Sequence, residues 1–409
     1  MTYLVVVLGL LLLIFLHELG HFVAARAVGI KPRKFYVGFP PALAKVRRNG
    51  VEYGIGTIPL GGYVKIPGMH RPAARDFDAW MQSALREDPA LAPAAQRLRR
   101  QLEAENFAGA REDLPELEGL VAHAQLTPGA RRIAERAVRE VEEGTGADAY
   151  WRQPTWKRLV VIAAGPFANV VVAFVIFFAM YAGGAPTGPA TTTVADVDPT
   201  LPAALAGLHS GDKVLAVDGV QTKTFAAVSK RIRASHGRAI TVTVERDGRE
   251  LTLGPRKTVN RAGRWIWGFV PSADLQTHPI GTSLRWAGSA CWAITKGTGS
   301  ALGALFHKKE RSQLTGTLGI VRESAAQLRV GLPYYLQILG IVSMSLALLN
   351  LLPLLPLDGG HIAVSIIESV RRRALAREVY ERVSVIGFAL IILIWVIALQ
   401  HDLGSGGPG

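Results

Sequence analysis

The chain of 409 residues has little charge, few acids and almost no cysteine. Its one cysteine, Cys291, excludes an intrachain disulfide and a metal cage built of cysteines alone. Only 19% of the residues are charged, with 46 Lys and Arg against 32 Asp and Glu, a net charge of +14. A soluble nucleic-acid binder with that excess would carry more charge and less apolar bulk, and no compact basic stripe with aromatics appears, so we expect no nucleic-acid partner. The 49% of hydrophobic residues disfavours disorder.

The apolar residues are gathered into blocks. The four runs cover residues 4–16, 159–181, 332–357 and 383–399. A helix needs about 20 apolar residues to span the hydrocarbon. The last three runs are long enough or nearly so, and the first is long enough if it continues through His17 and Glu18 to Ala25. No Lys or Arg precedes the first run, which disfavours a cleaved signal peptide.

Basic residues near these runs predict their orientation. Eight Lys and Arg lie between Arg26 and Lys65, against the single acid Glu52. Further basic residues precede the second run and separate the third from the fourth, whereas residues 182–195 have none. Arg322 and Arg329 favour the opposite orientation weakly. We therefore predict a multi-pass α-helical membrane protein with four spans and both termini outside, and with residues 26–158 and 358–382 inside.

The connecting segments differ in character. Asn49-Gly50 is a strong two-residue turn signal and predicts a β-hairpin around it. Residues 70–150 hold 11 basic and 15 acidic residues in short helical patterns, which indicates a cytoplasmic helical insert. The predicted parts are a first span at 1–28, a hairpin and loop at 29–69, the insert at 70–150, a second span at 151–182, an outer domain at 183–275, amphipathic linker helices at 276–331, a third span at 332–360, a cytoplasmic amphipathic segment at 361–382, a fourth span at 383–401 and a tail at 402–409.

The first span contains His17-Glu18-Leu19-Gly20-His21, an HExxH sequence. On a helix, residues four apart share a face, so both imidazoles can reach one metal ion, while Glu18 can act on a metal-bound water without being a ligand. Ordinary hydrogen-bonded histidines are the alternative. That alternative is weak in a membrane, where three ionisable groups in five residues are costly and mark function.

A catalytic zinc usually has three protein ligands, so a third is needed. Asp358 is the only acid at the end of the third run, and it follows Pro353 and Pro356, which break the helix. We expect Asp358 to lie at a depth in the membrane similar to that of His17 and His21. An ordinary turn at Asp358-Gly359-Gly360 is the alternative, and the adjacent His361 could be the ligand instead of Asp358. Asn169 in the second run lies about 16 Å along its helix, near the same depth. It is expected either to bond the substrate or to pair within the helix bundle.

Together, His17-Glu18-Leu19-Gly20-His21 and the segment from Asn350 to Gly360 (NLLPLLPLDGG) resemble the site-2 protease family of intramembrane zinc metalloproteases. Gly165-Pro166-Phe167-Ala168-Asn169 supports this resemblance. The resemblance implies that His17, His21 and Asp358 bind Zn²⁺ and that Glu18 is the general base and acid. It also implies that Asn350 positions the substrate backbone. His361 is then a turn or surface histidine.

Two further segments resemble parts of the same family. The hairpin and the following Gly61 and Gly62 look like its membrane-associated β-loop, whose free edge could pair with an extended substrate, although an ordinary hairpin is the alternative. Residues 201–219 resemble the helix, turn and strand of a bacterial PDZ domain, which makes the domain at 183–275 an inserted extracytoplasmic PDZ domain. Such a domain binds peptides by strand addition or excludes bulky ectodomains.

The resemblance implies an intramembrane zinc endopeptidase in the bacterial cytoplasmic (inner) membrane. Its partners would be membrane lipid and single-span substrates, either anti-sigma-factor-like proteins or signal-peptide remnants, already trimmed outside. Two alternatives remain open, a membrane transporter whose buried His and Asp carry ions, and a PDZ adaptor with a non-proteolytic metal site.

Overall fold

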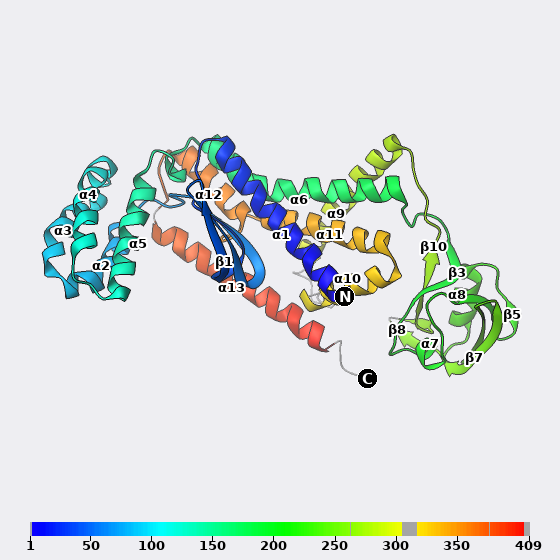
Figure 1. Ribbon diagram of the computed structural model, residues 1–409. Coiled ribbons are helices and arrows are strands. Elements are labelled where there is room, and N and C mark those ends of the chain that lie inside the picture. The colour runs from blue at the N-terminus through cyan, green and yellow to red at the C-terminus, as the bar shows by residue number, and fades with distance from the viewer. Residues whose placement is uncertain (1, 262, 305–316, 376, 405–409) are drawn as a thin grey trace. The chain divides into compact units, whose positions relative to one another are not determined.

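The computed structural model describes residues 2–261, 263–304, 317–375 and 377–404 (Figure 1). The chain forms two compact units, one of residues 1–10, 170–346 and 391–409, the other of residues 11–169 and 347–390. The predicted linker and tail include residues 305–316 and 405–409, which lie outside the described residues.

Three helices are long and apolar enough to cross a membrane. They are α1 (Thr2–Ala27), α6 (Thr155–Gly183) and α11 (Leu332–Asn350). Each is apolar on all sides, as expected of a helix surrounded by lipid or by other helices. The third ends at Asn350, before the prolines, and so is shorter than the predicted span at 332–360. The fourth apolar run lies in α13 (Arg377–Gly404), and the arrangement of four spans stays a prediction.

Residues 34–65 form an antiparallel pair of long strands, β1 (Lys34–Arg48) and β2 (Val51–Lys65). Asn49 and Gly50 both have positive φ, 50° and 78°, as a tight hairpin turn requires. The strands bend and pair a second time, so that residues 34–37 lie between 52–55 and 62–65. Segment 62–65 is thereby attached to β1 on one side only among the described pairings.

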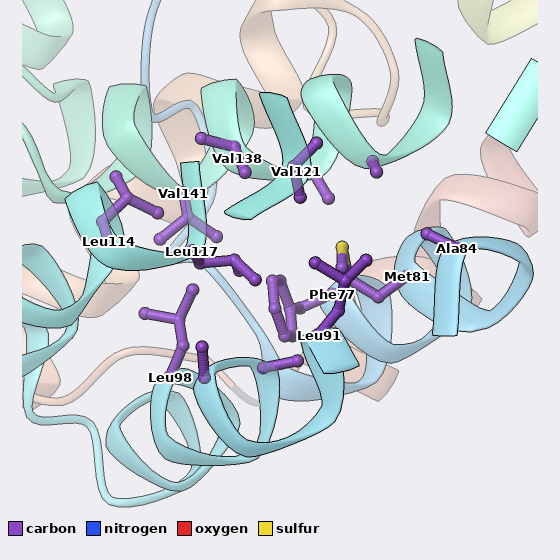
Figure 2. Packing of buried hydrophobic residues seen from close by; sticks show 14 of the residues in the cluster. Phe77, Met81, Ala84, Leu91, Leu98, Leu114, Leu117, Val121, Val138 and Val141 are labelled. Carbon is purple, nitrogen blue, oxygen red and sulfur yellow. The ribbon is translucent and has the colours of Figure 1, made fainter. Parts of the chain in front are cut away.

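The insert is a small helical bundle with its own core (Figure 2). Its helices are α2 (Ala74–Glu87), α3 (Ala92–Glu103), α4 (Phe107–His123) and α5 (Pro128–Thr145). Phe77, Met81, Leu98 and Leu117 are at most 1% exposed and face one another across the bundle. Burial of each such side chain contributes about 1.5–3 kcal/mol, so this core stabilises the bundle without help from a cofactor.

The two ends of the insert are joined by main-chain hydrogen bonds. The amide of Tyr150 donates to the carbonyl of Pro67 at 2.9 Å, and the amide of Trp151 donates to that of Gly68 at 3.0 Å. The chain therefore leaves the β1–β2 sheet and returns to it at one place before α6 begins.

The other unit contains an antiparallel sheet and two short helices. The strands lie in the order β10-β3-β4-β6-β7, with β5 paired to β4. Their bounds are β3 Ala190–Val197, β4 Lys213–Val217, β5 Val220–Gln221, β6 Ala239–Arg246, β7 Arg249–Lys257 and β10 Phe269–Ala273, with α7 at Pro202–Leu205 and α8 at Phe225–Ala234. Alternate residues of β6 are buried, which is the period of a strand with one face on a core.

One buried ion pair fixes this sheet internally. Both carboxylate oxygens of Asp212 lie 2.7 Å from guanidinium nitrogens of Arg246, and Asp212 is 1% exposed. The amide of His209 donates to the same carboxylate at 2.9 Å.

The remaining described strands and α-helices are the small hairpin β8 (Val259–Arg261) and β9 (Arg264–Ile266) and the helices α9 (Ile280–Ala304), α10 (Thr317–Val330) and α12 (Asp358–Arg371).

Candidate metal centre

The two histidines of α1 point in the same direction. His17 and His21 lie one helical turn apart and are each 7% exposed. Their rings are nearly perpendicular, with centroids 4.9 Å apart, and their Nε2 atoms are 3.3 Å apart. As the sequence predicts, residues four apart lie on one face of the helix, and their Nε2 atoms are close enough to bind one metal ion.

Asp358 reaches the same point from the start of α12. Its Oδ2 atom lies 3.2 Å from Nε2 of His17 and 3.4 Å from Nε2 of His21. The turn before it is tight: a Cβ on Gly359 would lie 2.2 Å from the carbonyl oxygen of Leu351, and one on Gly360 would lie 2.5 Å from the amide nitrogen of Leu355. These two glycines let the chain fold back after α11, and that fold brings the carboxylate to the histidines.

The three atoms fit a zinc ion. Ligands about 2.0–2.1 Å from a tetrahedral zinc lie about 3.3–3.4 Å from one another, close to the three distances seen here. Oδ2 of Asp358 is buried and accepts no hydrogen bond from the described residues, which is what a ligand atom requires. Within the described parts of the chain, His17, His21 and Asp358 form the one group of three or more such side chains able to hold a metal.

Helix α6 orients both imidazoles through their other nitrogens. Nδ1 of His21 lies 2.8 Å from the carbonyl oxygen of Val161, so this nitrogen carries the proton and Nε2 is left as the ligand. The side-chain amide of Asn169 lies 3.3 Å from Nδ1 of His17, and Asn169 is fully buried. The carbonyl of Val161 has no side-chain signature, so sequence reasoning missed its part in the site.

Two glycines let α1 and α6 approach closely. A Cβ on Gly165 would lie 2.2 Å from Nε2 of His21, and a Cβ on Gly20 would lie 2.4 Å from the carbonyl oxygen of Ala164. Gly165 belongs to the segment that supported the family resemblance. Its role here is steric, because any side chain at this position would occupy the space of a ligand.

Glu18 faces the β2 strand. A Cβ on Gly62 would lie 2.9 Å from Cγ of Glu18. Gly61 has a φ of +124°, and a Cβ there would lie 2.8 Å from the ring of Phe39. Both glycines thus stand where side chains would collide, and Gly62 lies next to Glu18 with no side chain of its own between them.

Two other residues singled out in the sequence lie near these segments. Asn350 is the last residue of α11 and is partly buried. His361 lies in the first turn of α12, outside the group of three ligands. It is partly buried, and one of its nitrogens lies 3.2 Å from Oη of Tyr380, so it is not a surface histidine.

Comparison with known proteins gives one consistent result. The sequence profile of peptidase family M50 matches residues 5–394. The zinc metalloprotease RasP of Geobacillus kaustophilus is 29% identical over 405 residues, covering 96% of this chain and 95% of RasP. The Enterococcus faecalis protein named "Probable protease eep" is 27% identical over 429 residues, covering 98% of this chain and 97% of that protein.

The profile covers nearly the whole chain, including His17, His21 and Asp358, the three candidate metal ligands. Together with three candidate spans, it makes this an integral membrane protein that uses zinc. The chain belongs to peptidase family M50 and is a zinc metalloendopeptidase of the site-2 protease type.

Proposed function

We propose that the protein cleaves single-span membrane proteins within the bilayer, at a zinc ion held by His17, His21 and Asp358. The observation that carries this proposal is the convergence of three ligand atoms, 3.2–3.4 Å apart, beside Glu18 on a helix apolar enough to span a membrane. The substrate class follows the resemblance, namely anti-sigma-factor-like proteins or signal-peptide remnants that have been trimmed outside.

Each residue has a defined task in this proposal. Nε2 of His17, Nε2 of His21 and Oδ2 of Asp358 hold zinc, which when bound polarises a water molecule and the scissile carbonyl. Glu18, which is not a ligand, takes a proton from the attacking water and returns it to the leaving amine. Asn169 acts on His17 rather than on the substrate, because its buried amide is in contact with Nδ1 of that ring. Asn350 remains the candidate for a contact with the substrate backbone.

The substrate is received as an extended strand at residues 61–64 of β2. This segment pairs with β1 on one side among the described pairings, and its Gly62 lies next to Glu18. A helix hides its peptide bonds in its own hydrogen bonds, so a protease must unwind its substrate before cleavage. Strand addition supplies replacement hydrogen bonds at the place where the helix is lost.

The topology follows the distribution of charge. We propose four spans in the bacterial cytoplasmic membrane, with the insert α2–α5 inside and the sheet β3–β10 outside as a PDZ domain. The strand order and the helices α7 and α8 support a PDZ-like domain, which would either bind peptides or act as a size filter.

The test is the substitution Glu18→Gln in the full-length protein. We expect zinc per mole of protein to stay unchanged while cleavage of a single-span substrate falls about 10³-fold, because the proton acceptor is lost. Glu118→Gln on the exposed side of α4 is the matched control and should cleave normally. Continued cleavage in the Glu18→Gln variant would contradict proteolysis at this site. Single-span proteins that accumulate in cells carrying this variant would identify the substrates.

A further inference from the structure

A groove lies where β2 leaves the metal centre. Its cavity of about 420 Å³ is bounded on one side by residues 63–66 and on the other by α2 and α5 of the insert. Asp76, Phe77 and Trp80 of α2 contribute to its wall. The strand itself connects this groove with Glu18, since Gly62 touches Glu18 and Lys65 lies in the groove.

The main-chain amide and carbonyl groups of β2 are arranged so that a further strand could pair with them on the side away from β1. The carbonyl of Lys65 accepts from the amide of Arg33 at 2.8 Å, so Lys65 is bonded towards β1. Neighbouring residues of a strand direct these groups to opposite sides, so those of Val64 and Gly62 point away from β1. A peptide that pairs with Gly62 and Val64 would therefore pass Glu18 and continue along β2 into the groove.

Ion pairs hold the far wall of the groove against the strand. Nζ of Lys65 lies 2.8 Å from carboxylate oxygens of both Glu140 and Glu143 on α5. The guanidinium of Arg33 pairs with Asp148 at 3.1 Å. These pairs are partly buried, so the insert is fixed to the sheet at a defined separation and the groove has a stable width.

We propose that this groove binds the cytoplasmic stretch of the substrate that directly follows its cleaved span, held as an extended peptide. The proposal rests on the proposed function and makes the helical insert a specificity determinant of the same active site. A span cut at the metal must continue towards the cytoplasm, and the groove continues the strand edge on the side that the charge pattern assigns to the cytoplasm. An apolar residue of the peptide packs against Trp80. The Lys or Arg residues that flank the inner end of a span lie at the wall formed by Asp76 and Glu140, opposite the basic residues Lys65, His70 and Arg71 of the same lining.

Two substrates separate this idea from the proposed function. One is a single-span protein with its own cytoplasmic segment, and the other has the first residues of that segment replaced by a Gly-Ser linker of equal length. Each is cleaved by the wild-type enzyme and by two groove variants, Trp80→Ala and Asp76→Lys. Asp76 is partly exposed, so Asp76→Lys remains informative if loss of Trp80 disturbs the bundle. Glu118→Lys on α4 is the matched charge control, outside the groove.

For the natural segment, both groove variants should raise KM about tenfold, as loss of an aromatic or charged anchor does, with kcat nearly unchanged. For the linker substrate and for Glu118→Lys, KM should match its wild-type value. Equal KM values for all variants on the natural segment, with normal cleavage, would overturn the groove proposal alone. Cleavage of neither substrate by the wild-type enzyme would overturn the proposed function itself.

Discussion

The metal centre and the helical insert use charged residues in opposite ways. In the insert, charges lie on the outside of amphipathic helices and apolar side chains fill the core (Figure 2). In the metal centre, His17, His21 and Asp358 project from apolar surroundings and are largely buried. The insert is built from one continuous stretch, 74–145, whereas the centre gathers its ligands from opposite ends of the chain.

This difference shows what each region depends on. The insert is stabilised by burying apolar surface, so its charges can be changed at small cost. The centre buries polar groups that are costly in an apolar setting unless each has a partner. We therefore expect changes in one region to leave the other intact, and the following experiments test that separation.

The largest effect is expected from His17→Ala. Removing one of three ligands should release zinc and lower cleavage on the order of 10⁴-fold, because the residues act as a unit. Zinc content by mass spectrometry and cleavage of a single-span substrate measure this, and a chelator should have the same effect on the wild type. Hydrogen exchange of α2–α5 should not change. A variant that retains full zinc would remove His17 from the ligand set.

The converse change is Leu98→Ala in the core of the insert. Leu98 is fully buried, so the free energy of unfolding of the bundle should fall by about 3 kcal/mol. Hydrogen exchange in the whole protein measures this, and Leu120→Ala, at a side chain 38% exposed, should cost less than about 0.5 kcal/mol. Zinc content should be unaltered. Loss of zinc in Leu98→Ala would mean that the two regions are not separable.

Asn169→Ala tests whether the side chain of Asn169 orients the candidate ligand His17, and it leaves the three candidate ligands unchanged. Its amide contacts Nδ1 of His17, and loss of such an orienting partner lowers zinc affinity about 10- to 100-fold. Competition with a fluorescent chelator measures the affinity directly, without a substrate. Asn169→Asp places a carboxylate oxygen where the amide nitrogen of Asn169 contacts Nδ1 of His17, so it can accept the Nδ1 proton that ligation through Nε2 requires and should restore most of the affinity. Wild-type affinity in Asn169→Ala would assign this residue to packing alone.

The smallest effect concerns the sheet that contains β3, β4 and β6, and it depends on pH. Burial alone would raise the pKa of Asp212, but the Arg246 guanidinium and the His209 amide lower it by more, so its pKa lies below the ordinary 3.8. The ion pair therefore stabilises the sheet fully at neutral pH, and this contribution is lost as the pH falls below the ordinary value. Because Arg246 is partly exposed, Asp212→Asn should cost about 1–2 kcal/mol at pH 7.

Hydrogen exchange of β3–β10 in both proteins provides the measurement. The difference between wild type and Asp212→Asn should shrink in acid, where the wild-type carboxylate is also protonated. A difference that stays constant from pH 7 to acid would show that the ion pair does not cause it.

The sequence predicts those features that depend on local patterns. Asn49-Gly50 signals its hairpin because the turn needs positive φ at both residues, and HExxH signals its ligands because helical spacing alone aligns them. Asp358 was identifiable as the one acid at the end of an apolar run. The additional pairing of residues 34–37 with 52–55 was not predicted, because it depends on bends in both strands that no short motif specifies. The contact of Gly165 with His21 likewise depends on how two helices meet.

The hydrogen bonds from Tyr150 to Pro67 and from Trp151 to Gly68 have a consequence for the history and engineering of the chain. These bonds join the end of β2 to the segment just before α6, and they involve no residue of the helices α2–α5. The insert is therefore a separate domain placed between two segments that already bond to each other. Its length and content could change, by gain, loss or exchange of a whole domain, without moving the histidines of α1. If the groove beside the insert binds substrate as proposed, exchange of the insert would change substrate preference and leave the residues of the candidate metal centre in place.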